Sequence, residues 1–371
     1  MPDIFVYGTL RHVPLLRLIA DQSVTPRAAV LPEMAIRCAA SADYPVPVPD
    51  DTAMAQGVIC RVDDDGFARL NWYESAFGYA PVTHTVRVDG IDCEALVWLP
   101  QTTEDAAQEP WNLSDWQAKW ADLTLRAAQE AMALFGKVPA SRIGRFWETF
   151  QGRADAAIRA ANMARPVVGS DTHADTVEQI EQGHAHAGFF VTRADRLRHP
   201  TFAGGTGPVL DRETFLTGDA SVVLPYDPVR DRVLLTEQFR MGPYARGAAY
   251  PWTLEPVAGR VDPGETPETC AMRECVEEAG VALRELIPAA HHYPSTGATS
   301  EFLYTYIGLC DLPDLPAGGG GLADEGEDIR THLLSFDAAM DLVSSGEATD
   351  GPLVLLLLWL ERVRPRLRAT A

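Results

Sequence analysis

Three glutamates in the C-terminal half, Glu274, Glu277 and Glu278, stand within five residues of one another. Residues three and four apart share one face of a helix, so these carboxylates would lie together and repel one another. Divalent cations that prefer oxygen ligands would make the same arrangement favourable. Arg273 precedes Glu277 by four residues and can hold part of the carboxylate array in place. The spacing therefore predicts a cation site, with a solvated acidic helix face as the alternative.

A helix over 267–279 would position these carboxylates. Thr266 can cap its first turn through the hydroxyl, and Pro267 suits the first helical position, where no N–H is needed. Gly280 can take the left-handed conformation that ends a helix. We expect about three and a half turns, with Glu265 in the loop before them pointing back to the helix.

Residues 259–281 resemble the Nudix box, G-x5-E-x7-R-E-U-x-E-E-x-G-U, where U is an aliphatic residue. The fixed letters all match, and Cys275 stands where an aliphatic residue is usual and can fill the same buried place. The resemblance implies a Nudix hydrolase, an enzyme that cleaves a nucleoside diphosphate linked to another group with magnesium or manganese. It places Arg273, Glu274 and Glu277 among the catalytic residues.

Three further segments, 235–240, 251–259 and 321–330, resemble the ADP-ribose pyrophosphatase branch of that family. This likeness predicts Mg²⁺-dependent hydrolysis of ADP-ribose to AMP and ribose 5-phosphate. In the loop after the box, Thr296 occupies the place where the branch usually has a proline, and Pro294 lies two residues earlier. Another nucleotide sugar, such as GDP-mannose, therefore stays open as the substrate.

The resemblance to that branch also assigns the metal ligands. The backbone carbonyl of Ala258 and the carboxylates of Glu274, Glu278 and Glu327 would hold the ions, with Glu325 as the residue that activates the attacking water. This chemistry needs such a set, because a pyrophosphate repels a nucleophile until cations offset its charge. A carboxylate near the water can then remove its proton.

Substrate-binding residues follow from the same resemblance. Arg240 matches a phosphate-binding arginine, and its planar guanidinium suits that role. Arg212 and Phe189 match residues that flank the adenine and come from the partner subunit of a homodimer, although a plain core position is an equal alternative for Phe189. Glu301 is expected to contact the substrate or to assist the metal site.

A second set of candidates lies near the N-terminus, where a strand at 4–7 runs into a glycine-containing turn that can bind an anion. Residues 5–10 and 70–74 resemble the gamma-glutamylcyclotransferase-like family, which has a small mixed β-barrel. The resemblance implies that Glu74 acts as acid and base. A glutamyl-type carboxylate would be cradled by Tyr7, Gly8, Thr9 and Leu10. A domain that only senses a glutamyl metabolite would have the same residues, so both alternatives stay open.

Three parts are expected in the 371 residues: a cyclotransferase-like domain (1–105), a helical connector (106–170) and a Nudix domain (171–371). The fold class is therefore α/β (α+β), a mixed β-barrel followed by helices and an α/β/α sandwich. Strands are expected at 4–7, 57–62, 83–88, 93–99, 189–191, 220–225, 232–238, 302–309 and 329–335. Polar linkers are expected at 101–110 and 166–183, and an extended loop at 45–49. The whole combination resembles bacterial tellurite-resistance Nudix proteins.

The bulk composition is that of a globular protein, with 46% hydrophobic and 22% charged residues. A formal net charge of −21 argues against nucleic acid and anionic membranes as partners. The N-terminus shows no signal peptide, and the apolar run 353–360 is too short to span a bilayer. Six cysteines without zinc spacing indicate reduced thiols, so we expect a cytoplasmic protein.

Overall fold

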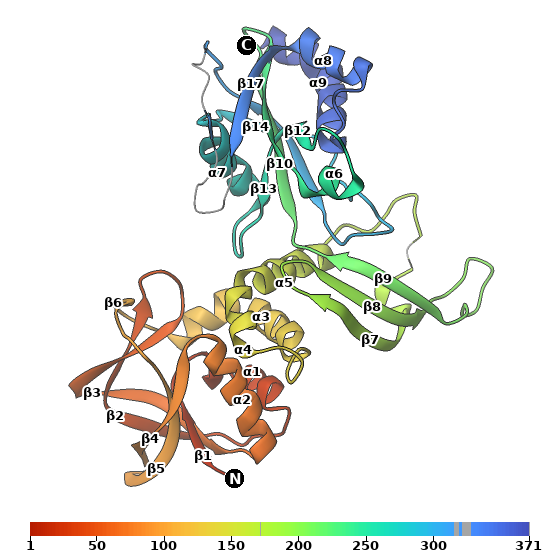
Figure 1. The fold of residues 1–371 in the computed structure, drawn as a ribbon. Helices are drawn as coiled ribbons and strands as arrows, with labels where there is room; N and C mark the ends of the chain where they lie inside the picture. Colours follow the sequence, from red (N-terminus) through yellow and green to blue (C-terminus); the bar gives the residue numbers. More distant parts are fainter. Residues whose placement is uncertain (171, 315–318, 321–327, 371) are drawn as a thin grey trace. The chain divides into compact units, whose positions relative to one another are not determined.

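In the computed structural model, which describes residues 1–170, 172–314, 319–320 and 328–370, the chain divides into two units (Figure 1). They are Met1–Ala161 and Asn162–Ala371. Each unit has hydrophobic clusters of its own, so each can be understood from its own residues.

A closed β-barrel forms the centre of the first unit. Its strands are β1 (Asp3–Val6), β2 (Arg27–Ala39), β3 (Pro45–Arg61), β4 (Tyr79–Val88) and β5 (Ile91–Pro100). They pair in the order β3-β1-β5-β4-β2, and β2 pairs with β3 again, which closes the ring. The β1–β5 pairing is parallel and the others are antiparallel, so the predicted mixed barrel is confirmed. A short strand, β6 (Ala106–Pro110), is added to β2.

Helices cover one side of this barrel. They are α1 (Val13–Ala20), α2 (Asp64–Ala76), α3 (Leu113–Met132), α4 (Ala140–Arg145) and α5 (Trp147–Ala161), with a short 3-10 helix η1 (Thr9–Arg11) before α1. Alternate residues of a strand face opposite sides, so Ile4 on β1 packs with Leu16 and Trp116 of the helices. Phe5 points into the barrel instead. The helices expected as a separate connector thus pack within the first unit, while the boundaries at 105 and 170 stay predictions.

An open mixed sheet forms the centre of the second unit. Its strands are β10 (Ala220–Asp227), β11 (Arg232–Phe239), β12 (Trp252–Glu255), β13 (Val257–Arg260), β14 (Glu285–Pro288), β15 (Leu303–Leu309), β16 (Gly319–Gly320) and β17 (Ile329–Ser335). The order is β14-β15-β10-β11-β17-β16, with β12 beside β11 and β13 beside β10. The turn expected at 227–231 joins β10 to β11 as an antiparallel pair.

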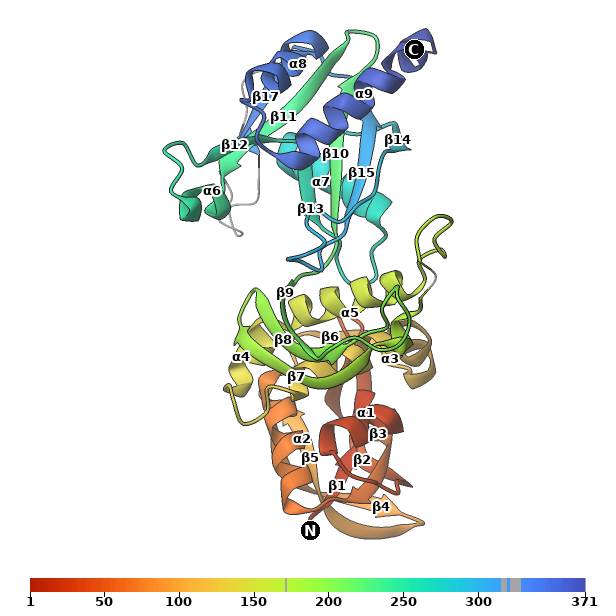
Figure 2. The ribbon, with the colours of Figure 1, turned by 90° about the vertical axis from the view of Figure 1, so that its right-hand side faces the viewer.

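Helices lie on both faces of this sheet, as Figures 1 and 2 show. They are α6 (Met241–Arg246), α7 (Pro267–Ala279), α8 (Phe336–Ser345) and α9 (Gly351–Ala369). Along β10, Val222 and Leu224 pack in the cluster of α8 and α9. Between them, Val223 packs with Ala271 and Cys275 of α7. The predicted α/β/α sandwich is confirmed, and Cys275 fills the buried aliphatic place as expected.

A smaller sheet precedes the sandwich in the second unit. It consists of β7 (Glu178–Ala187), β8 (Val191–Arg198) and β9 (Leu210–Leu216), after a short 3-10 helix η2 (Ala174–Thr176). The end of β9 is tied to the loop before β15, because Phe215 N donates to Ala298 O (2.9 Å) and Ser300 N donates to Phe215 O (2.9 Å). This contact fixes the loop 294–301 against β9.

Several local expectations were wrong. Prolines 45, 47 and 49 belong to β3 and pair with β2, instead of forming a loop. Alternate residues of a strand direct their N–H groups to the same side, so these prolines remove donors from one side only. The expected linkers contain β6 and the start of β7. A strand was expected at 189–191, but Phe189 lies in the turn between β7 and β8, and β8 begins at Val191.

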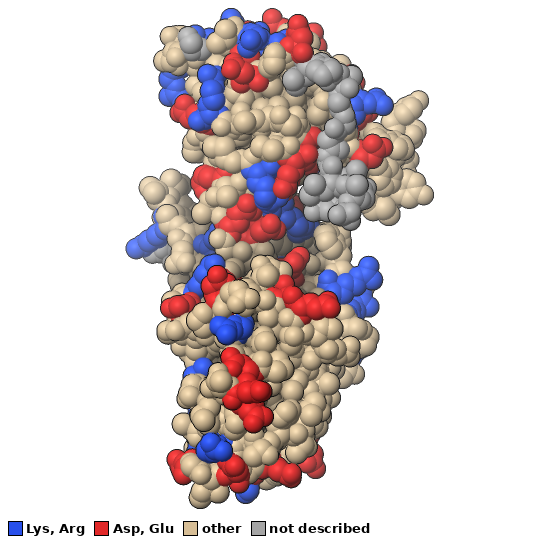
Figure 3. Space-filling view, turned by 90° about the vertical axis from the view of Figure 1, so that its left-hand side faces the viewer, with Lys and Arg blue, Asp and Glu red and all other residues tan. Residues whose placement is uncertain are grey.

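The state of the cysteines and the distribution of surface charge can be compared with what the composition predicts. All six cysteines are free. None of the helices in the described parts of the chain is both long and apolar enough to span a bilayer. On the face drawn in Figure 3, the described acidic and basic side chains lie in small interspersed groups, without a broad basic field. That face therefore offers no extended basic surface to a polyanion.

One buried ion pair joins α3 to α5. Arg153 donates from Nε to Glu130 Oε1 (2.9 Å), and its side chain is only 5% exposed. Removing one partner from such a pair leaves a buried charge without compensation, which costs more than the pair itself contributes.

Replacing Glu130 by glutamine should lower the free energy of unfolding of the first unit by about 3 kcal/mol, because Arg153 would keep its charge without a carboxylate. Urea unfolding followed by tryptophan fluorescence measures this, since all tryptophans except Trp252 and Trp359 lie in the first unit.

The matched control is Asp122→Asn on the same helix. Asp122 pairs with Arg126 on the surface, with side chains 70% and 45% exposed. Exposed pairs contribute little, so this variant should change the free energy of unfolding by less than about 0.5 kcal/mol. Equal losses in both variants would contradict the structural role of the buried pair.

Candidate active site on helix α7

Helix α7 forms where its sequence predicts it, over Pro267–Ala279. Thr266 Oγ1 accepts a hydrogen bond from Thr269 N (3.2 Å), which satisfies one free donor of the first turn. Gly280 ends the helix with a φ of 64°, a conformation that suits a residue without Cβ. The carboxylates of the helix are therefore placed by local signals alone.

Arg273 holds the acidic side chains around α7 together. Its Nε and Nη2 each donate to Glu265 at 3.1 Å. Its Nη1 donates to Glu274 Oε1 (2.7 Å) and to Glu277 Oε2 (2.9 Å). The bonds to Glu265, and then the charge of Glu274, hold the pKa of Arg273 above its usual range. One fixed cation thus offsets the repulsion among three carboxylates.

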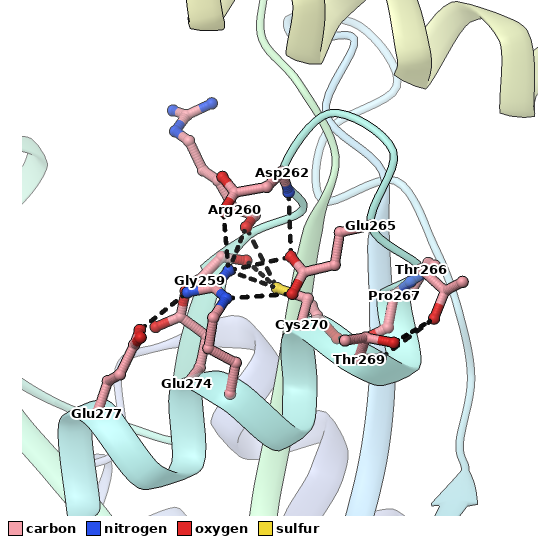
Figure 4. Close-up of polar contacts among 12 residues, drawn as sticks. Gly259, Arg260, Asp262, Glu265, Thr266, Pro267, Thr269, Cys270, Glu274 and Glu277 are labelled. Carbon is pink, nitrogen blue, oxygen red and sulfur yellow. Dashed lines mark hydrogen bonds and ion pairs between the residues drawn. The ribbon is translucent and has the colours of Figure 1, made fainter. Parts of the chain in front are cut away.

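Figure 4 shows Glu274 and Glu277 reaching from α7 toward the segment that carries Gly259 and Arg260. A Cβ built on Gly259 would stand 1.8 Å from Glu274 Oε1, so only glycine leaves room for this carboxylate. Glu278 is 2% exposed and accepts from Ala258 N (3.2 Å). The helix and β13 therefore bring Glu274 and Glu278 to one stretch of backbone.

The chemistry of this donor set fits a hard divalent cation. Glu274 and Glu278 supply carboxylate oxygens next to Ala258, the residue whose carbonyl is the predicted backbone ligand. Within the described residues, no three His, Cys, Asp or Glu side chains converge as a metal cluster. The other predicted carboxylates, Glu325 and Glu327, lie outside the described residues.

Arg240 lies at the end of β11 in a two-pronged ion pair. Its Nε donates to Glu255 Oε2 (2.9 Å) and its Nη2 donates to the same oxygen (2.6 Å). The side chain of Glu255 is 10% exposed and that of Arg240 is 41% exposed, so the carboxylate of the pair is more deeply buried than the guanidinium. The sequence did not identify Glu255 as the partner, and phosphate binding by Arg240 stays a prediction.

Arg260 is a residue near the site that sequence reasoning missed. Its guanidinium lies 5.1 Å from the ring centre of Phe189 and 5.9 Å from that of Phe190. In Figure 4 it points away from α7. Burial raises the pKa of Glu301, while the charge of Arg260 lowers it. Arg260 thus lies close to two of the predicted substrate residues, and its place directly after Gly259 was the signal that could have found it.

The other predicted binding residues differ in their surroundings. Phe189 is 49% exposed, so it is a surface residue and the core alternative is wrong. Arg212 lies exposed on β9, where its Nη1 donates to Asp211 O (2.8 Å). Nothing in the described residues joins Arg212 to Phe189, and their binding roles stay predictions.

Glu74 in the first unit lies among tyrosines. Burial raises its pKa to about 7. Its charge contributes to raising the pKa values of Tyr7, Tyr73 and Tyr79, whose largest cause is burial. Across the described parts of the chain, the Glu74 carboxyl has no hydrogen-bond or ion-pair partner. Such a group can exchange a proton near neutral pH.

The predicted cradle lies on the same unit. Tyr7 follows β1 and donates through its hydroxyl to Trp98 O (2.8 Å). A Cβ on Gly8 would stand 2.6 Å from Pro45 Cγ, so this turn depends on glycine. Thr9 and Leu10 lie in η1. The structure therefore brings Tyr7 near Glu74, and a binding role of the cradle stays a prediction.

Comparison with known proteins matches each unit to a different family. A family model described as NUDIX domain matches residues 216–356, and one described as Gamma-glutamyl cyclotransferase, AIG2-like, matches residues 4–118. The ADP-ribose pyrophosphatase of Escherichia coli (strain K12) is 40% identical over 185 residues, which is 50% of this chain and 88% of that protein.

Two further similarities are weaker. The GDP-mannose pyrophosphatase of Salmonella paratyphi B is 33% identical over 150 residues, 40% of this chain and 77% of that protein. A solved structure, "Crystal structure of ADP compounds hydrolase", aligns with 54% of this chain and 100% of that chain at a TM-score of 0.41 and 19% identity.

Gly259→Ala should displace the Glu274 carboxylate, because the added Cβ would overlap it. We expect Mn²⁺ binding, measured by electron paramagnetic resonance, to weaken at least about tenfold, with a loss of stability of about 1–3 kcal/mol. The control is Gly242→Ala in α6, where no atom lies within 4 Å of the added Cβ. Unchanged Mn²⁺ affinity in Gly259→Ala would show that the position of Glu274 is irrelevant to the metal.

Proposed function

The chain belongs to the Nudix family, and from this premise we propose that its second unit hydrolyses the pyrophosphate of ADP-ribose to AMP and ribose 5-phosphate. The observation that carries the proposal is the placement of Glu274 against Gly259 and of Glu278 against Ala258, beside a carboxylate-binding Arg273. The ADP-ribose pyrophosphatase of Escherichia coli, at 40% identity, supports the substrate. The less similar GDP-mannose pyrophosphatase supports GDP-mannose as the alternative substrate.

Magnesium would be held by Glu274, Glu278, Glu327 and the carbonyl of Ala258, with manganese as the alternative ion. The bound metal offsets the charge of the diphosphate and lowers the pKa of a bound water. Glu325 removes the proton from the attacking water oxygen.

Arg273 has a positioning role in this proposal. It binds Glu265, Glu274 and Glu277 at once, so it fixes the carboxylates before substrate arrives. Preorganised charges need no rearrangement during the reaction, which is the main source of electrostatic catalysis.

Arg240 would bind the diphosphate. Its Nε and Nη2 are taken by Glu255, so Nη1 is the group that would donate to a phosphate oxygen. Glu255 then serves to orient the guanidinium plane. A charge-assisted bond from a fixed guanidinium is stronger than one from a freely rotating side chain.

Phe189 and Arg212 would flank the adenine from the partner subunit of a homodimer. The exposed ring of Phe189, in the turn after β7, supports a role at a surface between subunits. Glu301 would contact the substrate or assist the metal site. A homodimer and a cytoplasmic location belong to this proposal, and the likeness to tellurite-resistance proteins stays a prediction.

Purified protein with millimolar magnesium should release AMP from ADP-ribose faster than GMP from GDP-mannose, with activity lost on chelation of the metal. Chromatography of the nucleotide products measures both reactions. Absence of AMP release at saturating ADP-ribose would reject this substrate, and faster cleavage of GDP-mannose would establish the alternative.

Glu325→Gln should lower kcat by about 10²–10⁴-fold, because the water would lose its proton acceptor, while Mn²⁺ affinity stays near normal. The control is Glu347→Gln, which removes one exposed carboxylate between α8 and α9. A wild-type rate in Glu325→Gln would remove its role as the base.

A second candidate function belongs to the first unit. We infer that Glu74 transfers a proton to or from a glutamyl-type ligand, because its pKa of about 7 allows both directions at neutral pH. Tyr7, Gly8, Thr9 and Leu10 would cradle the ligand. Calorimetric titration with glutamyl compounds separates the possibilities: heat with turnover supports an enzyme, heat without turnover supports a sensor, and no heat rejects both.

Glu74→Gln should make the first unit more stable at high pH. When folding raises the pKa of a carboxyl, the folded state loses stability as the pH rises from the pKa of the unfolded chain, about 4.5, through the pKa of the folded state, about 7. Between about pH 5.5 and pH 8, the variant should gain on the order of 2 kcal/mol over the wild type in free energy of unfolding. Urea unfolding followed by tryptophan fluorescence measures the difference.

The matched control is Glu94→Gln, on the exposed face of β5. It removes the same charge from the same unit and should show no such pH dependence. A Glu74→Gln curve parallel to that of the wild type would contradict the raised pKa.

A further inference from the structure

A groove of about 470 Å³ opens on the barrel of the first unit. Residues of β2, β3 and the start of α3 line it, together with Tyr7 and Arg11. Its volume lies in the range of small-molecule sites. Glu74 is not part of this lining, whereas Tyr7 lies in the lining and is close enough to Glu74 for the charge of Glu74 to raise its pKa.

Arg11 is the cation of the groove, and no carboxylate lines it. Some other arginines of this unit have partners, such as Asp3 for Arg61 and Ile19 O for Arg69, whereas Arg142 also has a buried Nε without one among the described residues. The guanidinium of Arg11 has no hydrogen-bond or ion-pair partner in any described part of the chain, and its Nε is buried. Burial lowers the pKa of Arg11, as expected for a cation that loses water without gaining an anion.

A buried donor without an acceptor is unfavourable, so a fold that keeps one needs a reason for it. No carboxylate of the described residues lines the groove, although the chain has a net charge of −21. Both features point to an anionic ligand, whose charge would satisfy Arg11 and would not be repelled by the walls.

The walls of the groove restrict that ligand further. Met34, Ile36, Met54 and Trp111 give the groove an apolar side, and Asn112, Ser114 and Gln117 give it a polar side near α3. Met54 is 56% exposed, so its side chain is accessible to a ligand in the groove. A bare phosphate would leave these apolar walls unused and would bring two charges to a single cation. An aliphatic chain that ends in one carboxylate fits both the apolar walls and the single positive charge of Arg11.

We propose that this groove binds a small aliphatic monocarboxylate, with its carboxylate on the guanidinium of Arg11 and its chain against Met34, Ile36 and Met54. The site rests on the cavity and on the unpaired arginine. It is independent of the hydrolase in the second unit, but it shares Tyr7 and the turn η1 with the cradle proposed for the ligand of Glu74.

The test uses the full-length chain and hexanoate as the probe, in a titration followed by saturation-transfer difference NMR. A probe of this size should bind with a Kd on the order of millimolar. Hexan-1-ol, which lacks the charge, and inorganic phosphate, which lacks the chain, should each bind at least about tenfold more weakly. Phosphate binding as tight as that of hexanoate would overturn the proposal.

Variants then locate the bound probe. Arg11→Gln should weaken hexanoate binding at least about tenfold, whereas Arg27→Gln, an equal change of charge on the exposed start of β2, should leave it unchanged. Met54→Glu places a negative charge on an exposed groove side chain and should also weaken binding. Equal affinity in Arg11→Gln, or a loss in Glu74→Gln alone, would overturn the assignment.

Discussion

The acidic site of the second unit depends on the bonds that the guanidinium of Arg273 makes to the surrounding carboxylates. Glutamates at this spacing repel one another on a bare helix. Arg273 bonds to Glu265, Glu274 and Glu277, so the side chains gather instead of spreading into water. The same guanidinium also donates to the carbonyl of Arg260 (3.3 Å), which ties the helix to β13. Charge balance and backbone position are therefore set by a single side chain.

The sandwich around α7 fixes the other side of this arrangement. Ala271 and Cys275 bury one face of the helix against Val223 of β10. Strand β13 pairs with the same strand β10, with Ala258 beside Val222. The positions of α7 and of the β13 backbone are therefore both fixed by β10. Gly259 completes the approach, because a larger residue would occupy the place of the Glu274 carboxylate. A helix and a strand therefore hold the Glu274 and Glu278 part of the site.

The sequence predicted the local features well and the long-range ones poorly. Helix α7 could be delimited because Thr266 and Gly280 carry its end signals within the segment itself. By contrast, the strand character of prolines 45, 47 and 49 depends on pairing with β2, which no local pattern reveals. The same holds for Arg240 and Glu255, fifteen residues apart, and for Arg260 and Phe189. Contacts between distant segments need the fold, and the predicted substrate-binding residues Arg240 and Phe189 make such contacts.

Closure of the first-unit barrel has a consequence for how the protein is made. All strands of the ring lie between Asp3 and Pro100, so their hydrogen bonding can be completed soon after this stretch leaves the ribosome. Domains generally fold as units during synthesis, the N-terminal one first. A closed ring leaves little strand edge on which nascent chains could pair with one another, and β6 pairs with the part of β2 that extends beyond the ring. The early half is thereby protected from aggregation while the hydrolase half is still being translated.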